Sequence, residues 1–514
     1  MMATSVSQAY ATDYATVDSI IYAVNPGDTE ARVYSCDPLV TEVRIVSKVT
    51  IAGKEYPVTM VGPNCFKDAA HLKRCIIAPS VTVVRESAFR DCKTLEYVDF
   101  GTGVTSIGNS AFTSNTSLKT VKLSTSLKTI EKQAFYKCSA LPEITIPASV
   151  ETIGNNAFYQ CSAIKRVNIE NLAAWCRIHF DNYAANPLNF SRKIYMGGVE
   201  VTELVIPEGV TSIGAEAFRV CTALTKVTLP STLRTMGDNA FYGCSGILSA
   251  VMPDSLSEMG TAVFKGCSKL KEINIPNGIK SISQELFSGC KALTTINLPT
   301  TITTVGKQAF YNCSGLLQMT FPDSLKELGN GVFYGCGALK TVCLGACITT
   351  IPMETFRNCN ALTAIKLPRS VTTIGESAFS GCRNLAEVRM SRNVTTLAAN
   401  AFNCMNIKDI YISATVPPTA VANSFARYTA NLHVPEQSIA AYKADAVWGQ
   451  FQSITMGVTI TDTDSEEPAV YYDLSGRKVA DPTSGIYIEK KGDKTRKVLL
   501  NKGCLKSVKR RSPP

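Results

Sequence analysis

The chain contains few histidines and none of the common catalytic motifs. Its 514 residues include only three histidines, His71, His179 and His433, which stand far apart with no spacing typical of metal ligands. The sequence has no phosphate-binding P-loop, no dinucleotide-binding glycine motif, no zinc-protease motif and no nucleophile elbow. Repeated carboxylate pairs suited to acid–base catalysis are scarce as well. We therefore expect a protein that is not an enzyme and that uses no cofactor and no metal.

The sequence also lacks a long apolar run and a recognisable export signal. No stretch of 18 consecutive apolar residues is present, so no transmembrane helix is expected. The first ten residues have neither the basic start nor the apolar core of a secretion signal. With 45% hydrophobic and 18% charged residues, the composition is that of a folded protein rather than a disordered one.

Positive charge is concentrated at the C-terminal end. The formal net charge is +10, but residues 489–514 hold ten basic and two acidic residues, which leaves only +2 for the preceding 488 residues. This balance does not favour nucleic-acid binding by the body of the chain. We interpret the basic tail as a solvated end, with a nucleic-acid or membrane-surface patch at residues 506–511 as the alternative.

Phenylalanine recurs every 23 residues along most of the chain. A fixed period in the twenties is typical of a solenoid, in which each repeat packs only on its neighbours. The interval of 60 residues between Phe158 and Phe218 is one period plus 37, and it predicts an insertion at about residues 171–201. The series comprises Phe66, Phe89, Phe112, Phe135, Phe158, Phe218, Phe241, Phe264, Phe287, Phe310, Phe333, Phe356, Phe379, Phe402 and Phe425.

Other apolar residues repeat in phase with the phenylalanines. They follow the phenylalanine by six, nine and eleven residues, as in the segment Leu293–Leu298, and the last two alternate as in a strand with one buried face. A proline such as Pro299 then stops the strand. The phenylalanine segment, for example residues 376–382, has room for only one or two helical turns. The sequence thus predicts an α/β repeat solenoid, β-rich, with one short parallel strand per repeat and short helical or 3-10 turns.

The recurring pattern, roughly V-T-x-I-G-x-x-A-F-x-x-C-x-x-L-x-x-V-x-L-P, resembles the BspA-like leucine-rich repeats of bacterial surface proteins. Its clearest copies are residues 210–224 and 371–385, and the resemblance covers about residues 40–456. It implies a leucine-rich-repeat solenoid in a secreted or cell-surface protein that binds extracellular proteins, glycans, host matrix or other cells. The alternatives are a structural spacer or scaffold of the cell envelope without a specific ligand and, for the location, the cytoplasm.

The segments outside the repeats complete the predicted domain organisation. The segment at 469–500, through Asp473–Val479 and Gly485–Ile488, resembles the type IX secretion sorting domains of Bacteroidetes proteins, and this resemblance implies export. The predicted parts are an N-terminal β cap at 1–62, the solenoid at 63–410, a C-terminal cap at 411–456, an acidic linker at 457–468, a small β segment at 469–500 and a basic tail at 501–514.

Eleven of the 19 cysteines share one repeat position, three residues after the phenylalanine. A disulfide ladder, a metal array and a column of buried thiols are the three interpretations. Side chains stacked in parallel have poor geometry for disulfides, so we favour buried thiols. Asn115 replaces cysteine in one repeat, which suits a role in which a small polar group meets the backbone of a turn. The spacing of Cys343 and Cys347 is only a weak zinc signal.

The candidate binding surface is the exposed face of the predicted strands, whose residues are polar and of mixed charge. The tyrosines beside the phenylalanines are expected to cover the core, or else to present hydroxyl groups on the other side. Trp175 is a candidate contact in the insertion, with a packed structural role as the alternative, and a third hypothesis places an enzyme site around Trp175, His179 and Asp181. The candidates are Lys122, Arg166, Lys226, Glu272, Asn274, Asn297, Lys366 and Trp175.

Overall fold

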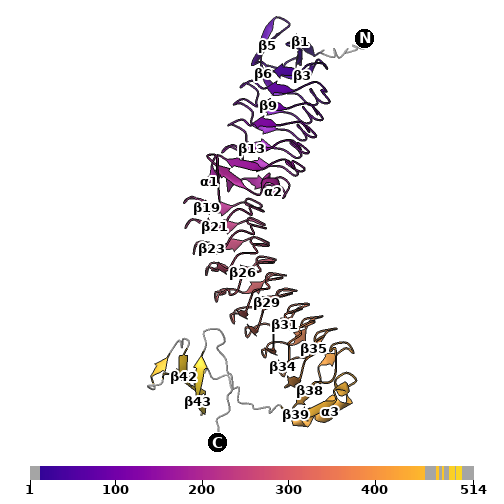
Figure 1. The fold of residues 1–514 in the computed structure, drawn as a ribbon, viewed down its shortest axis with the longest axis vertical. Helices are drawn as coiled ribbons and strands as arrows, with labels where there is room; N and C mark the ends of the chain where they lie inside the picture. The colour runs from indigo at the N-terminus through magenta and orange to yellow at the C-terminus, as the bar shows by residue number, and fades with distance from the viewer. Residues whose placement is uncertain (1–11, 458–469, 474–476, 480–484, 492–493, 501–514) are drawn as a thin grey trace, which may run out of the picture. The chain divides into compact units, whose positions relative to one another are not determined.

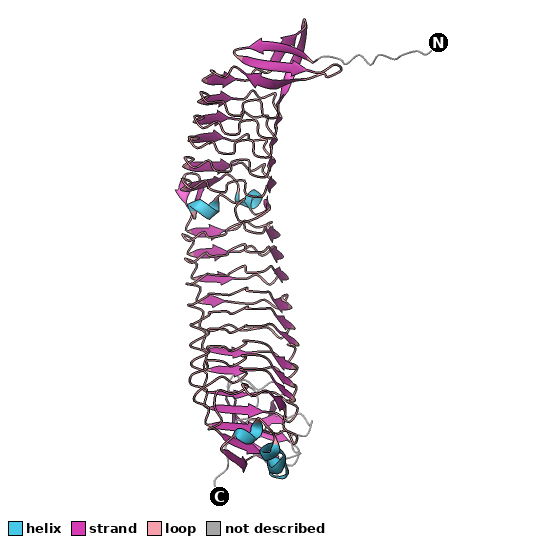
Figure 2. Ribbon diagram, turned by 90° about the vertical axis from the view of Figure 1, so that its right-hand side faces the viewer, coloured by secondary structure: helices cyan, strands magenta, loops and turns pink. Residues whose placement is uncertain are grey.

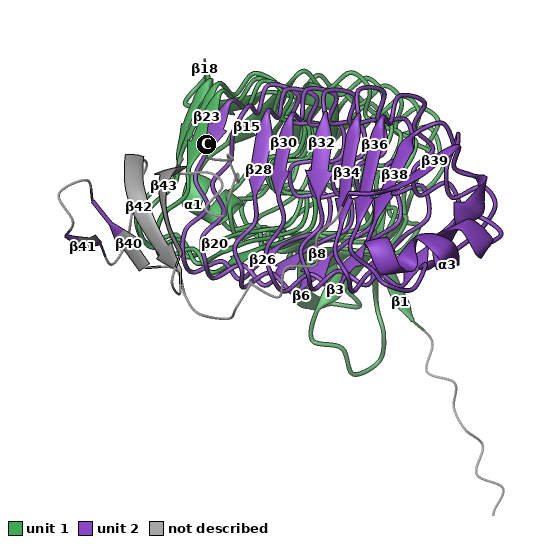
Figure 3. Cartoon of the chain, turned by 90° about the horizontal axis from the view of Figure 1, so that it is seen from below, with its two compact units in different colours: residues 1–270 green, residues 271–514 purple. Residues whose placement is uncertain are grey.

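The computed structural model describes residues 12–457, 470–473, 477–479, 485–491 and 494–500. The chain divides into two compact units, residues 1–270 and residues 271–514 (Figure 3). Each unit is built largely of stacked coils, and the coils contribute strands to parallel ladders on two sides of the stack (Figures 1 and 2). The repeat solenoid predicted from the phenylalanine period is confirmed.

The two ladders differ in the length of their strands. We call the ladder whose strands have three or four residues in unit 1 the longer ladder, and it contains the strands that the sequence predicts. Neighbouring strands pair in parallel one period apart, so that Tyr97 lies between Arg74 and Thr120. In the three-residue strands the middle residue is usually buried, as Val98 is, while its neighbours are exposed or half-buried. These strands are β4 (Glu42–Arg44), β7 (Arg74–Ile76), β9 (Tyr97–Asp99), β11 (Thr120–Lys122), β13 (Glu143–Ile146), β15 (Arg166–Ile169), β17 (Ile194–Met196), β19 (Glu203–Val205), β21 (Lys226–Thr228) and β23 (Ser249–Val251).

A second ladder of two-residue strands runs through the same coils. The sequence predicts only a turn here, because two residues are too few to show strand alternation. In each pair the second residue is usually apolar and buried, as for Ile107, which pairs with Val84 and Ile130. In unit 1 these strands are β8 (Val83–Val84), β10 (Ser106–Ile107), β12 (Thr129–Ile130), β14 (Thr152–Ile153), β16 (His179–Phe180), β20 (Ser212–Ile213), β22 (Thr235–Met236) and β24 (Glu258–Met259).

The phenylalanine segments form single turns closed by hydrogen bonds of 3-10 spacing, such as that from the Arg90 N–H to the carbonyl oxygen of Ser87 at 3.1 Å, and not continuous helices. Residues two before and two after Phe89, namely Ser87 and Asp91, both have left-handed φ angles, 53° and 61°. This alternation breaks a helix but turns the backbone N–H of Phe89 towards the next coil, where it donates to the carbonyl oxygen of Ala111 at 2.8 Å. The buried rings stack from coil to coil, as for Phe89 and Phe112 at 4.8 Å between centroids. The phenylalanine column is therefore the core of each unit.

Unit 2 repeats this arrangement with two parallel ladders. Its longer ladder contains β25 (Glu272–Ile273), β28 (Gln318–Thr320), β30 (Thr341–Cys343), β32 (Ala364–Lys366), β34 (Glu387–Met390), β36 (Asp409–Ile412), β38 (Asn431–Val434) and β39 (Ser453–Met456). Its shorter ladder contains β26 (Ser281–Ile282), β27 (Thr304–Val305), β29 (Glu327–Leu328), β31 (Thr350–Ile351), β33 (Thr373–Ile374), β35 (Thr396–Leu397) and β37 (Thr419–Ala420).

One predicted strand is absent from the longer ladder. Residues 293–298 keep the expected burial pattern, with Leu293 and Ile296 buried and Asn297 exposed, but they are not assigned as a strand. Burial depends on which side chains face the core, whereas a strand also requires ladder hydrogen bonds, and β28 pairs onward with β30. The prediction of a strand at Leu293–Leu298 is therefore wrong, although the side-chain pattern behind it is right.

Strands precede the first coil, and short helices follow the last one. The leading strands are β1 (Asp13–Val17), β2 (Ile20–Val24), β3 (Ala31–Cys36), β5 (Lys48–Ile51) and β6 (Lys54–Val61), and β6 pairs in parallel with β8. The trailing helices are η1 (Glu436–Ser438), α3 (Ile439–Ala444) and η2 (Trp448–Gln450). Tyr442 and Trp448 are fully buried there, and the Trp448 indole N–H donates to the carbonyl oxygen of Pro418 at 2.8 Å.

The insertion and the C-terminal segment hold the remaining elements. The insertion contains α1 (Leu172–Trp175), α2 (Leu188–Ser191) and β18 (Val199–Glu200), which forms an antiparallel hairpin with β17. The C-terminal segment is a separate antiparallel sheet of β40 (Val470–Tyr472), β41 (Lys478–Val479), β42 (Gly485–Lys491) and β43 (Lys494–Leu500). The predicted acidic linker lies outside the described residues apart from residue 457, and the basic tail lies wholly outside them.

Candidate interaction surface

The solvent side of the longer ladder brings the predicted site residues into register along each unit. Lys122, Arg166, Lys226, Glu272 and Lys366 lie on exposed strand positions, in β11, β15, β21, β25 and β32 respectively. Asn274 and Asn297 are exposed next to or outside strands. These seven residues share one kind of surface but are spread over many coils, so they do not converge on a compact site.

Trp175 does not belong to this surface. Its side chain is 1% exposed, it packs on Phe180 with 5.3 Å between ring centroids, and its indole N–H donates to the carbonyl oxygen of Ala217 at 2.8 Å. His179, by contrast, is exposed and lies 3.2 Å from Asp181. The three residues of the enzyme hypothesis are therefore not presented together, and the placement of Trp175 corrects its role as a surface candidate.

Tyr97 organises a charged cluster on the exposed face of unit 1. The guanidinium of Arg74 lies 3.9 Å from the centre of the Tyr97 ring, and the Tyr97 hydroxyl donates to Asp99 at 3.1 Å. Lys122 lies 3.6 Å from the Asp99 carboxylate. Interaction with the Tyr97 hydroxyl, followed by the charge of Asp99, raises the pKa of Lys122. Arg74 in turn pairs with Glu42 at 3.7 Å, so the cations on this face are matched by carboxylates.

A second stacked pair forms beside the insertion. The guanidinium of Arg166 lies 4.4 Å from the centre of the Tyr195 ring and 3.8 Å from the carboxylate of Glu143. Arg166 also donates to the carbonyl oxygen of Gly198 in the β17–β18 turn at 3.3 Å. The predicted residue Arg166 is thus held by three partners, which fixes its position on the surface.

Unit 2 carries a longer stack that the sequence did not reveal. In β34, β36 and β38, the Arg389 guanidinium lies 4.0 Å from the Tyr411 ring centre, and the Tyr411 ring stacks on His433 at 4.4 Å. His433 bonds to Asp409 at 3.0 Å, and Asn431 donates to the same carboxylate at 3.1 Å. The bond with His433, followed by that with Asn431, lowers the pKa of Asp409.

A one-residue deletion explains why this stack escaped prediction. Cys404 follows its phenylalanine by two residues instead of three, so Asp409 pairs with Glu387 at a separation of 22 residues instead of 23. Tyr411 therefore follows Phe402 by nine residues, whereas its register partner Arg389 follows Phe379 by ten. Cys404 still reaches the repeat site, because its thiol donates to the carbonyl oxygen of Phe379 at 2.8 Å.

The eleven repeat cysteines form buried thiols rather than disulfides. All are buried and free, and most donate to the carbonyl oxygen of the phenylalanine 26 residues earlier, as Cys244 does to Phe218 at 3.0 Å. Burial raises the pKa of Cys244 to about 12, which suppresses the reactive thiolate. Asn115 differs from its expected role: it is fully buried, and neither side-chain polar atom has a hydrogen-bond partner among the described residues.

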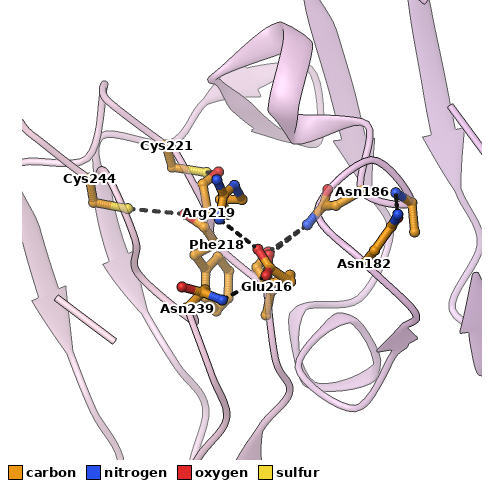
Figure 4. Close-up of polar contacts among 10 residues, drawn as sticks. Asn182, Asn186, Glu216, Phe218, Arg219, Cys221, Asn239 and Cys244 are labelled. Atoms are coloured by element: carbon orange, nitrogen blue, oxygen red, sulfur yellow. Dashed lines mark hydrogen bonds and ion pairs between the residues drawn. The ribbon is translucent and has the colours of Figure 1, made fainter. Parts of the chain in front are cut away.

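Where the insertion interrupts the stack, its side chains donate hydrogen bonds to the backbone of the next coil (Figure 4). At ordinary junctions the carbonyl oxygen before a phenylalanine accepts the backbone N–H of the preceding phenylalanine. The carbonyl oxygen of Ala217 instead accepts from the Trp175 indole at 2.8 Å and from the Asn186 amide at 3.3 Å. Asn186 also donates to the carbonyl oxygen of Glu216 at 2.8 Å. Trp175 and Asn186 thus replace backbone donors, which points to a structural role.

A buried ion pair lies at the same junction (Figure 4). Arg219 bonds to the Glu216 carboxylate at 3.1 Å, and the Asn239 amide donates to the other carboxylate oxygen at 2.8 Å. The guanidinium lies 5.3 Å from the Tyr183 ring centre and 4.0 Å from that of Tyr242. Burial raises the pKa of Glu216, against the opposing effect of Arg219. The pair is therefore held largely out of solvent by hydrogen bonds and by the two tyrosine rings.

The tyrosines beside the phenylalanine column are half-buried and partly stacked. Tyr136 and Tyr159 have ring centroids 5.8 Å apart, and Tyr311 and Tyr334 are 4.9 Å apart. Their rings cover the column while part of each side chain reaches solvent, so both expected roles are combined at these positions.

A metal site, a pocket and a membrane-spanning helix each place requirements on the described residues. Within the described ranges, no group of three or more His, Cys, Asp or Glu side chains could hold a metal ion. An open depression of about 420 Å³ lies over the shorter ladder of unit 1, and its Asp238 carboxylate accepts from the backbone of Thr261 at 2.6 Å. The helices in these ranges are a few residues long, and none is long and apolar enough to span a bilayer.

Solved leucine-rich repeat structures are similar to this chain, and the first described below shares its fold. A leucine-rich repeat protein from Bacteroides ovatus is 24% identical with a TM-score of 0.50, covering 74% of this chain and 95% of its own length. A leucine-rich cell surface protein from Faecalibacterium prausnitzii is 24% identical with a TM-score of 0.42, covering 78% of this chain and 94% of its own. No curated protein matches the chain.

The family comparison agrees with the repeat geometry. The BspA type leucine-rich repeat region matches in six copies, over residues 59–184, 189–317 and 304–428. These ranges cover most of the chain and contain the phenylalanine column, the thiol column and most of both ladders. The chain therefore belongs to the BspA type leucine-rich repeat family.

Proposed function

We propose that this chain is a non-enzymatic interaction protein, secreted or attached to the cell surface, that binds a protein or glycan partner through the exposed face of its longer ladder. The observation that carries the proposal is the placement of stacked aromatic and cationic side chains on that face. Two such pairs are Arg74 with Tyr97 and Arg389 with Tyr411. Their side chains lie on the solvent side of the strands and are not part of the buried core. The family resemblance supports the extracellular location.

The ladder geometry favours binding that is spread over several coils. Neighbouring coils repeat at about 4.8 Å, so one extended partner would meet equivalent positions on successive strands. Tyrosine and arginine are the side chains that most often dominate protein interfaces. Each stack is already ordered by its own contacts, as in the bond from Tyr97 to Asp99, so little side-chain freedom would be lost on binding.

A second candidate function is a spacer or envelope scaffold without a specific ligand. Many exposed positions of the longer ladder in both units carry small polar residues, such as Thr228, Asn297 and Thr320. Such a surface is soluble and regular but offers no aromatic or arginine anchor. The two candidates differ in whether the stacks contribute to any binding.

The test is a binding screen with the full chain and matched surface variants. Labelled protein would be applied to immobilised extracellular matrix proteins and to a glycan array. Any ligand captured by the native chain should bind at least about tenfold more weakly to Tyr97→Ala or Tyr411→Ala, since an interface anchor contributes more than about 1.4 kcal/mol. The control Thr228→Ala should bind as the native chain does. Absence of any ligand, or equal binding by all variants, would favour the spacer.

A further inference from the structure

We propose that the exposed face of β30, β32, β34 and β36 binds a sulfated polysaccharide. This inference rests on the proposed function and names the ligand class for one part of the longer ladder. Residues 338–412, which span these four strands, contain eight basic and four acidic residues, a net of +4. Because residues 1–488 sum to +2, the rest of that range is net −2, so this segment is the basic part of the solenoid.

The cations gather on one side of these coils. Lys366 and Arg389 are direct register partners on β32 and β34, and both are exposed. Lys340 and Lys408 immediately precede β30 and β36 and are exposed as well. Arg392 follows β34 after one residue, also exposed. With coils about 4.8 Å apart, these side chains form a short row of positive charge along the ladder.

Few carboxylates on this face neutralise the row. Of the residues that the structure describes, no carboxylate forms an ion pair with Lys340, Lys366, Arg392 or Lys408. Glu387 is bonded to Arg389 at 2.5 Å, and the Asp409 carboxylate, which is bonded to His433 at 3.0 Å, interacts electrostatically with the neighbouring Lys408. These two carboxylates offset part of the charge, and within the described part of the chain Lys340, Lys366 and Arg392 have no such partner. The row therefore keeps an excess of positive charge, and the partner that complements it is a polyanion.

Two lysines at equivalent positions in unit 1 are paired with carboxylates. Lys119 lies 3.0 Å from Glu96, and Lys122 lies 3.6 Å from Asp99. Lys119 and Lys122 stand seven and ten residues after their phenylalanine, as Lys340 and Lys366 do. The same two lattice positions thus carry compensated lysines at Lys119 and Lys122 and uncompensated lysines at Lys340 and Lys366, and the first pair is a matched control for the second.

A sulfated polysaccharide fits the row better than a single-stranded nucleic acid does. Proteins that hold single strands stack bases on open aromatic faces. Tyr411 is the aromatic residue of this surface, and its ring is covered by Arg389 at 4.0 Å and by His433 at 4.4 Å. The surface therefore offers charge and guanidinium forks, which suit sulfate groups repeated along an extended chain, but no open ring for a base.

The test compares two double variants of the full chain on immobilised heparin. Lys340→Gln/Lys366→Gln removes two uncompensated lysines, and Lys119→Gln/Lys122→Gln removes two compensated lysines from the same lattice positions. All four side chains are exposed, so neither variant should disturb folding. We expect the first variant to bind about tenfold or more weakly and the slope of log K against log salt to fall by about 2, as loss of two ionic contacts requires. The second variant should bind within about twofold of the native chain.

Every other outcome contradicts the assignment. Equal weakening by both variants would show general electrostatic attraction, and retained binding by the first variant would place the site elsewhere, including the basic tail that all variants keep. Equal affinity for fully desulfated heparin would remove the sulfate specificity. Equal or tighter binding of a DNA duplex with the same dependence on Lys340 and Lys366 would make the row a nucleic-acid site. These measurements use purified protein, so they stand apart from the cellular location and wider partner screen that test the proposed function.

Discussion

The indole nitrogen of Trp175 donates a hydrogen bond of 2.8 Å to the backbone carbonyl oxygen of Ala217. At the other coil junctions this carbonyl position is satisfied by the backbone N–H of the preceding phenylalanine. The insertion displaces that backbone, and a side chain takes its place. A tryptophan that looks like a surface contact in the sequence is therefore the means by which two coils are joined across an interruption.

Replacing this donor should destabilise unit 1. Trp175→Phe keeps an aromatic ring in the core but removes the indole N–H, which leaves the carbonyl of Ala217 with only the longer bond from Asn186. We expect a loss of about 1–3 kcal/mol in the free energy of unfolding, measured by denaturant titration. The control Tyr183→Phe changes an exposed ring of the same insertion and should cost little. Equal stability of Trp175→Phe and the native chain would contradict the role of the indole.

The thiol column predicts a stabilising substitution. Asn115 occupies the cysteine position of one coil with two buried polar atoms that have no partner among the described residues. Asn115→Cys should restore a thiol bond to the carbonyl of Phe89, as Cys138 makes to Phe112 at 3.2 Å, and should raise the free energy of unfolding by about 1–3 kcal/mol. The reverse change, Cys138→Asn, should lower it. A neutral or destabilising Asn115→Cys would show that the asparagine is satisfied in some other way.

Coil spacing can be tested at a glycine. A Cβ atom at Gly237 would lie 2.4 Å from the backbone nitrogen of Ala215 in the preceding coil, whereas a Cβ at Gly337 would meet nothing within 4 Å. Gly237→Ala should therefore force the coils apart and cost about 1–3 kcal/mol, while Gly337→Ala should be nearly neutral. Thermal unfolding of the two variants gives the comparison. Similar midpoints would mean that the coils are not packed as closely as the backbone indicates.

The buried carboxylate at the junction predicts a distinctive pH dependence. Burial raises the pKa of Glu216 in the folded chain above its ordinary value of 4.5, so the folded state binds a proton more tightly than the unfolded state. Stability from this group should increase as the pH falls from neutrality through the raised pKa, and level off below the unfolded value. The melting temperature of the native chain relative to Glu216→Gln should therefore rise on acidification.

Glu208 provides the opposite control. Hydrogen bonds from Ser231 lower the pKa of Glu208, so its contribution to stability should be present above the unfolded value and be lost as the pH falls. The melting temperature of the native chain relative to that of Glu208→Gln should therefore fall on acidification. Parallel pH profiles for the two glutamine variants would contradict the different surroundings of these carboxylates.

The sequence predicted the parts of the fold that repeat and missed those that depend on departures from the repeat. The phenylalanine period, the longer ladder and the buried thiols follow from many copies of one pattern. The Arg389–Tyr411 stack was missed because a single deletion shifts the register after Phe402, and Trp175 was placed at the surface because the donor it replaces can only be recognised from the neighbouring coil. The turn conformation around Phe89 was missed because the residue types at Ser87 and Asp91 do not by themselves indicate a left-handed backbone.

The most direct test of the proposed function is fractionation of the native cells, with mass spectrometry to identify the chain in each fraction. The account predicts that Tyr97 and Tyr411 peptides occur in the surface or medium fraction and are released by mild protease treatment of intact cells, since an exposed solenoid must meet its partner outside the cell. Recovery of the chain only from the cytoplasm, protected from external protease, would contradict the account.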